Sequence, residues 1–307
     1  MDMATINAAL ENVIGRVERA EVLDAPANAV ADIVGKYLKP GLIKDVLSGT
    51  GTGHPAHPIL ILLPLGSWAS AFFLDLVGSK DEGTAVAARR LIVIGNLAAL
   101  PTALTGLSDW ADTQGAERRV GLVHAGLNVT ALGLFTASAV ARQTHARGLG
   151  VLTAALGMGL VSVSGWLGGH LAYARGVGTD TTAFEVAPSN WTDVAAVDDV
   201  TDKPMRVDAG GVAVLLVRHA GELRAMSDRC THRGGPLHEG TIEDGCVECP
   251  WHGSRFRLTD GQIARGPATR PQRAFEVRTL DGRVEVRPAP DPGSLRTEPV
   301  TAGGEAF

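Results

Sequence analysis

The stretch Cys230-Thr-His-Arg-Gly-Gly-Pro-Leu, followed by Cys249-Pro-Trp-His-Gly-Ser-Arg-Phe, decides how the second half of this 307-residue chain folds. It contains two Cys-His pairs, Cys230/His232 and Cys249/His252, each beside glycine and proline. Thiolates and imidazoles are ligands of iron–sulfur clusters and of zinc. Glycine and proline allow the tight bends that bring two such loops to one site. The sequence therefore predicts a metal centre made by these four side chains.

The spacing C-x-H, 16 residues (233–248) and C-x-x-H resembles the Rieske family, over about residues 191–287. The resemblance implies a [2Fe–2S] cluster in which Cys230 and Cys249 hold one iron and His232 and His252 the other. Tetrahedral zinc is the alternative, because two cysteines and two histidines also suit that ion. The flanking runs Gly-Gly-Pro-Leu and Pro-Trp-His-Gly extend the match beyond the ligands and favour the Rieske assignment.

Three positions distinguish this stretch from the cytochrome bc type of the family. Gly235 and Trp251 stand where that type has two cysteines that form a disulfide, and Phe256 stands where it has a tyrosine. Ser254 is retained, and we expect its hydroxyl to donate to a cluster sulfur. The resemblance thus implies the ferredoxin type, with a reduction potential nearer ~−150 than ~+300 mV. Gly266-Pro267-Ala268 resembles the proline loop that covers the cluster in the family.

Four long apolar segments, at roughly 58–78, 88–107, 120–141 and 148–173, precede this region. Each is near the ~20 residues needed to cross a bilayer core. A soluble four-helix bundle is the alternative, but segments this long with almost no charge favour membrane spans. Pro64 and Pro101 are expected to kink their helices.

The whole sequence is consistent with a multidomain chain, an all-α four-helix transmembrane bundle followed by an all-β Rieske domain. The expected units are an amphipathic N-terminal arm, a membrane domain, the Rieske domain and a disordered tail rich in proline and glycine, at residues 1–50, 51–178, 185–288 and 289–307. Short apolar runs between turn signals predict the strands of the all-β part. They are Val212 to Val217, Leu223 to Met226, Phe275 to Val277 and Val284 to Val286.

If the chain crosses the membrane four times, several histidines lie at the same membrane face, which we call the near face. These residues are His54, His57, His124 and His170, with Asp109 beside them. An even number of spans places the Rieske domain at the same face. Such histidines could ligate a b-type haem, take protons from a quinol or bind a metal. Alternatively, they form hydrogen bonds that help the helices to pack.

The membrane half resembles a family of bacterial four-helix membrane proteins of unknown function. The resemblance rests on Gly53-His-Pro-Ala-His-Pro, Gly106-Leu-Ser-Asp-Trp and Gly165-Trp-Leu-Gly-Gly-His, within about residues 51–178. The family implies no particular chemistry.

These features predict a membrane-anchored electron-transfer protein. Single electrons would pass between the [2Fe–2S] cluster and a redox partner protein, or a haem or quinone at the near face. If the chain is an enzyme, it is an oxidoreductase. The alternatives are a component of a Rieske-type oxygenase and a redox-sensing membrane protein. A net charge of −5 lacks the excess of positive charge that is typical of nucleic-acid-binding proteins.

The orientation in the membrane does not follow from charge, because five basic residues flank the spans on each side. The first twenty residues show no export signal. The absent disulfide also removes a feature that suits an oxidising compartment. We therefore expect a multi-pass protein of the inner (plasma) membrane, with its N-terminus and Rieske domain in the cytoplasm.

Overall fold

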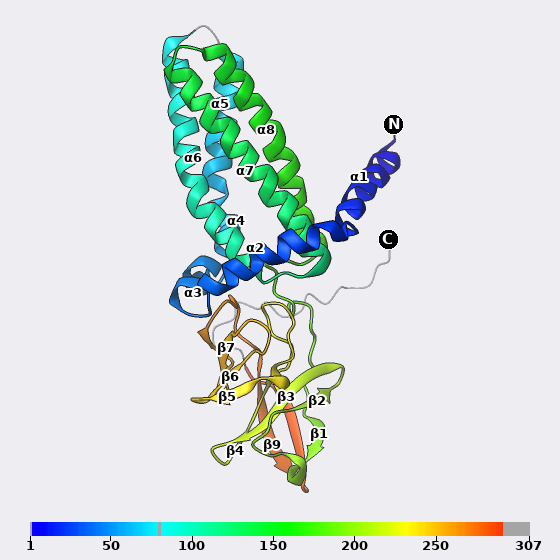
Figure 1. Cartoon of the computed structure of the whole chain (residues 1–307). Coiled ribbons are helices and arrows are strands. Elements are labelled where there is room, and N and C mark those ends of the chain that lie inside the picture. Colours follow the sequence, from blue (N-terminus) through cyan, green and yellow to red (C-terminus); the bar gives the residue numbers. More distant parts are fainter. Residues whose placement is uncertain (1, 79–80, 291–307) are drawn as a thin grey trace.

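The computed structural model describes residues 2–78 and 81–290, so most of the tail expected at 289–307 lies outside the described residues. A helical half stands above an all-β half (Figure 1). The helices are α1 (Met3–Glu18), α2 (Asp24–Tyr37), α3 (Leu42–Ser48), α4 (Ala56–Leu60), α5 (Leu62–Val77), α6 (Glu82–Ala111), α7 (Gly115–Gln143) and α8 (Arg147–Gly169). A π-helical turn, His170–Ala174, extends α8.

Four helical stretches are long and apolar enough to cross a membrane, as the sequence predicts. They are Ala56–Val77, Glu82–Ala111, Gly115–Gln143 and Arg147–Ala174. Only 22–28% of each apolar window is buried inside the structure, so most of these side chains face outward, as lipid contact requires. The first span is broken between α4 and α5. Pro64 lacks an N–H for the Leu60 carbonyl, which accepts from Thr102 Oγ1 at 3.3 Å instead. In contrast, α6 continues as one helix through Pro101.

The centre of the bundle is filled by stacked aromatic rings. Trp68 and Phe135 have centroids 4.3 Å apart and an interplanar angle of 9°. A Cβ on Gly157 would lie 3.1 Å from the Phe135 ring, and one on Gly95 would lie 2.5 Å from Trp68 Nε1. Glycine at these two positions therefore lets the helices approach closely. Gly126, by contrast, faces open space, so not every glycine of the spans packs a helix.

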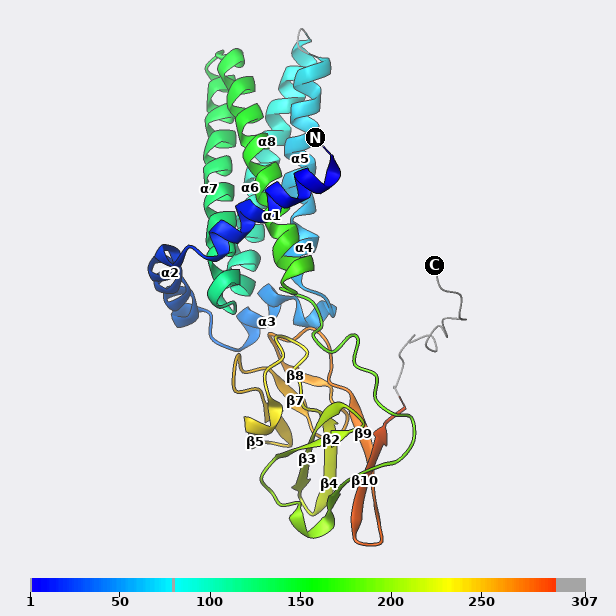
Figure 2. The ribbon, with the colours of Figure 1, turned by 90° about the vertical axis from the view of Figure 1, so that its right-hand side faces the viewer.

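The N-terminal arm crosses the near end of the bundle (Figures 1 and 2). Ile14 of α1 packs with Val120 and Leu167, and α2 packs Ala27 and Ala31 on Trp110. Arg119 of α7 binds Asp24 through two hydrogen bonds of 2.6 Å. These contacts fix the arm against the membrane domain.

The all-β half contains two antiparallel sheets and lies beyond the near end of the bundle (Figure 2). The six-stranded sheet has the order β1-β10-β9-β4-β3-β2 and the four-stranded sheet the order β5-β6-β7-β8. Their strands are β1 (Thr192–Ala196), β2 (Met205–Ala209), β3 (Val212–His219), β4 (Glu222–Ser227), β5 (Thr241–Glu243), β6 (Cys246–Glu248), β7 (Arg255–Arg257), β8 (Ile263–Arg265), β9 (Ala274–Leu280) and β10 (Arg283–Pro288). The four apolar runs predicted as strands become β3, β4, β9 and β10.

Candidate metal centre

Two hairpin-like loops present the four predicted ligands. Cys230 and His232 lie between β4 and β5, and Cys249 and His252 lie between β6 and β7. Each loop closes on itself: Gly234 N–H donates to Cys230 O at 2.8 Å, and Gly253 N–H donates to Cys249 O at 3.0 Å. Both glycines have positive φ, 77° and 74°, which other residues adopt only with strain.

The two thiols lie within hydrogen-bonding reach of each other. The hydrogen bond from Cys230, with backbone N–H groups of Trp251 and His252, lowers the pKa of Cys249 to about 7. The same thiol contact, together with burial, raises the pKa of Cys230 well above its ordinary value. Two thiols that share one proton behave in this way. Because the thiolate is the metal-binding form, this pair suits a metal that replaces the shared proton.

The two imidazoles face each other across the site, with ring centroids 5.0 Å apart and planes nearly perpendicular. Burial lowers the pKa of both His232 and His252, so the rings are neutral and can bind a metal. The Nδ1 atom of His232 is buried and has no hydrogen-bond partner. An orphaned buried nitrogen is costly unless something binds it, and an iron would satisfy it.

The shape of the site also fits a cluster. A Cβ on Gly235 would lie 2.9 Å from Cys249 Sγ and 3.0 Å from the Trp251 ring. Gly235 and Trp251 are therefore neighbours in space, as expected for positions that carry a disulfide in the cytochrome bc type. The proline loop lies against Ser254, whose Oγ accepts from Ala268 N–H at 3.0 Å. The hydroxyl proton of this buried serine stays available for a cluster sulfur.

A single zinc ion fits this arrangement less well. In residues 2–78 and 81–290, no group of three or more histidine, cysteine, aspartate or glutamate side chains is placed to hold one metal ion. The two thiols contact each other and the two imidazoles lie together, and this pairing suits two irons, one with two thiolates and one with two imidazoles. The assignment of the four ligands stays a prediction, and the donor set supports it.

Three of the histidines predicted at the near face, His57, His124 and His170, have polar partners within the protein. His57 Nδ1 lies 2.9 Å from Thr102 O, and His124 Nδ1 lies 2.8 Å from Ser164 O. His124 Nε2 contacts Asn128 at 3.1 Å, and His170 Nε2 contacts Glu18 at 2.9 Å. His54 is exposed in the loop before α4.

These partners belong to helices α6, α7, α8 and α1, so the contacts agree with the alternative in which the histidines help the helices to pack. Binding of haem, quinone or metal by the four histidines stays a prediction.

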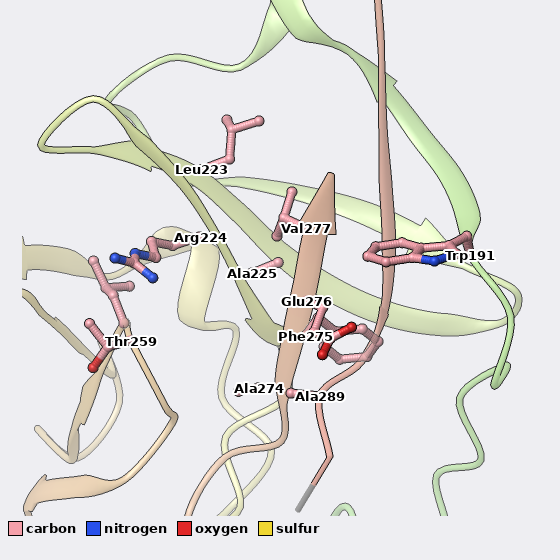
Figure 3. Close-up of a pocket in the computed structure, with 11 residues that line it drawn as sticks. Trp191, Leu223, Arg224, Ala225, Thr259, Ala274, Phe275, Glu276, Val277 and Ala289 are labelled. Atoms are coloured by element: carbon pink, nitrogen blue, oxygen red, sulfur yellow. The ribbon is translucent and has the colours of Figure 1, made fainter. Parts of the chain in front are cut away.

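Other candidate residues and hollows lie apart from the centre. Cys246 is buried in β6, and His238 Nδ1 lies 2.8 Å from Asp228 Oδ2. A hollow of about 420 Å³ lies on the six-stranded sheet, and Trp191, Leu223 and Phe275 are among the residues that line it (Figure 3). Beside it, Arg278 and Arg287 lie over the Trp191 ring, at 4.4 and 4.6 Å from its centroid. None of the predicted ligands lines the hollow.

Two residues beside the centre were not singled out from the sequence. Asp112 caps the end of α6, and its Oδ2 lies 3.6 Å from His232 Nε2. Lys44 of α3 forms an ion pair with Asp112 at 2.9 Å. Their sequence neighbours carry no metal motif, so only the fold reveals them.

Comparisons with known proteins agree with the two halves. Residues 190–281 match the family described as Rieske [2Fe-2S] domain, and residues 53–181 match that described as predicted membrane protein (DUF2231). The anthranilate 1,2-dioxygenase ferredoxin subunit of Burkholderia cepacia is 39% identical over 103 residues, covering 33% of this chain and 95% of that protein. Ferredoxin CarAc of Metapseudomonas resinovorans is 38% identical over 98 residues, covering 31% and 92%.

Among solved structures, the ferredoxin of carbazole 1,9a-dioxygenase from Nocardioides aromaticivorans IC177 is 29% identical. It covers 33% of this chain and 100% of its own, with a TM-score of 0.31. The Rieske domain implies a [2Fe–2S] cluster. By the match at residues 190–281 and the near-complete coverage of the ferredoxin subunits, the chain belongs to the Rieske [2Fe–2S] family, with a DUF2231 membrane domain at its N-terminal side.

Proposed function

We propose that this chain is a membrane-anchored electron carrier of the ferredoxin type. The observation that carries the proposal is the meeting of two thiols and two neutral imidazoles at the end of a bundle with four apolar helices. A [2Fe–2S] cluster bound there supplies one-electron chemistry. Cys230 and Cys249 would hold one iron, and His232 and His252 the other.

The residues around the four ligands would set the reduction potential of the cluster. Backbone N–H groups of His232 and Arg233 point at Cys230, and those of Trp251 and His252 point at Cys249. Such donors favour the more negative, reduced state. Phe256 is fully buried and offers no hydroxyl, so it gives no further stabilisation of that state. The backbone donors raise the potential, and it is the missing hydroxyl at Phe256 that supports a value in the lower part of the Rieske range.

The relatives suggest the kind of partner. Several are named as ferredoxin components of dioxygenases, so a reductase or an oxygenase is the partner that this family supports for the chain. The membrane domain would keep the carrier at the bilayer, where a membrane-bound partner could meet it. The cytoplasmic orientation belongs to the same proposal.

Iron and sulfide analysis of the purified full-length protein tests the ligand assignment. We expect two irons and two sulfides per chain and the paramagnetic resonance signal of a reduced [2Fe–2S] centre with mixed Cys/His ligation. His238→Ala is the matched control, because His238 lies in the same loop region and bonds Asp228. Cys249→Ser should lose the signal, whereas the control should keep it. Stoichiometric zinc without iron would refute the proposal.

A haem or quinone at the near face is a separate part of the proposal. It rests on the position of His54, His57, His124 and His170 at one end of the bundle. An optical spectrum of the purified protein would reveal haem by its Soret band. Quinol-dependent reduction of the cluster in liposomes, sensitive to His57→Leu, would support a quinone instead.

A further inference from the structure

The edge of the Rieske domain that carries His232 faces the protein's own membrane domain rather than solvent. Three segments surround this edge: residues 40–50 around α3, the turn 109–117 between α6 and α7, and Thr181 of the linker. We call these segments the cup. Figures 1 and 2 both show the cluster-bearing loops against the near end of the bundle.

Asp112 is the part of the cup that meets a predicted ligand. Its Oδ2 lies 3.6 Å from His232 Nε2, and the two side chains are only 12% and 14% exposed. The Nδ1 atom of the same ring is the buried nitrogen without a partner. If Nδ1 held an iron, Nε2 would carry the ring proton, 3.6 Å from the carboxylate of Asp112. The two ring nitrogens thus have two different roles.

Lys44 holds Asp112 in place. It is 3% exposed, pairs with Asp112 at 2.9 Å and donates to Ser108 O at 2.8 Å. A buried ion pair costs so much desolvation that apolar residues of similar size would stabilise the fold at least as well. The buried Lys44–Asp112 pair therefore favours specific positioning of Asp112 over simple packing.

Other polar contacts close the cup around the same edge. Gly266 N–H, in the proline loop, donates to Asp45 Oδ1 at 2.9 Å, and Arg233 pairs with Glu117 of α7. Thr181 Oγ1 donates to Cys230 O at 2.8 Å. Each of these contacts joins a ligand loop or the proline loop to the cup. The cup therefore contacts the part of the Rieske domain that carries the predicted ligands.

We propose that the cup is an intramolecular docking site for the histidine edge, with Asp112 as the positioning residue for His232 and Lys44 as the residue that fixes Asp112. Docking places the Asp112 carboxylate beside the ring of His232, so its charge would lower the reduction potential of a cluster bound there. A soluble redox protein then contacts a surface of the domain that the cup does not cover. Trp251, which is 56% exposed and lies beside Cys249, belongs to this surface. The redox consequence rests on the proposed electron-transfer function, whereas the docking itself does not.

The test compares Asp112→Asn with Asp24→Asn in full-length protein in nanodiscs. The control removes the carboxylate of Asp24 in the N-terminal arm, which pairs with Arg119 of the membrane domain. Hydrogen exchange is read in peptides covering α3 and residues 266–268. The potential is read by redox titration. We expect Asp112→Asn to speed exchange by on the order of tenfold or more, because it leaves the buried Lys44 without the carboxylate that pairs with it. Its midpoint should rise, because a negative charge near the ligand favours the oxidised cluster.

The possible outcomes separate docking from redox function. Unchanged exchange in Asp112→Asn would overturn the docking site, and faster exchange with an unchanged midpoint would overturn the role of Asp112 toward His232. The double variant Lys44→Met/Asp112→Asn removes both charges of the ion pair, so it keeps the test valid if the single variant misfolds. A protein without iron that still shows the exchange difference would refute the proposed function and leave the docking site supported.

Discussion

Replacing Ser254 by alanine should lower the reduction potential. Its Oγ accepts from Ala268 N–H at 3.0 Å, and the residue is fully buried beside Cys249, so its own proton is available to a cluster sulfur. A hydrogen bond to a charged group is worth about 1.5–3 kcal/mol. If roughly half of this is gained only on reduction, its loss lowers the midpoint by about 30–60 mV, because tenfold in a one-electron equilibrium is about 59 mV.

The assay for Ser254→Ala is a potentiometric titration followed by paramagnetic resonance. The matched control is Ser227→Ala, which removes another buried serine of the same domain at the end of strand β4. The loss of the acceptor for Ala268 should also lower the free energy of unfolding by about 1–3 kcal/mol, which thermal melts measure separately. A midpoint that stays within error of the native protein, while the stability falls, would refute the donation to sulfur.

Three further predictions concern the same centre and its orientation. Phe256→Tyr places a hydroxyl in the apolar core beside the cysteines and should raise the midpoint, whereas Phe256→Leu should not; equal midpoints for both variants would contradict this. Gly235→Ala forces a Cβ to within 2.9 Å of Cys249 Sγ and should reduce the iron content, whereas Gly126→Ala, which faces open space, should leave it unchanged; full iron occupancy in Gly235→Ala would count against the close approach. A fluorescent protein active only in the cytoplasm, fused after the last residue, should glow, and an export-dependent phosphatase there should be inactive; the reverse pattern would place the Rieske domain outside.

The ligand loops could be predicted because their information is local. Each Cys-His pair lies within four residues, and the glycines that bend the loops are beside it. The spans could be predicted for a similar reason, since about twenty apolar residues in a row are visible without any knowledge of packing. Only the predicted ends of the helices differ from those in the structure. Caps such as Asp81, at the start of α6, let the helix begin before the apolar run.

Contacts between distant segments could not be predicted. Lys44, Asp112 and His232 come from three separate parts of the chain, and the sequence shows Lys44 only as a basic residue near a span. Arg142 likewise looked like a charge between spans, but it forms an almost fully buried pair with Asp75 of α5. A pattern of apolar residues indicates which helices cross a membrane. It does not indicate which charges meet once the helices pack.

A line of polar side chains on α6 links the two halves that the sequence presents separately. Thr102, Thr105 and Ser108 are buried at helical spacing, and Asp112 continues the line at the end of the helix. Buried polar groups in a membrane protein need partners within the protein. Here His57 lies 2.9 Å from the backbone oxygen of Thr102, Lys44 donates to the backbone oxygen of Ser108, and Asp112 Oδ2 lies 3.6 Å from His232 Nε2. Since these partners come from α4, α3 and the Rieske domain in turn, the arm and the Rieske domain complete the polar side of the membrane domain.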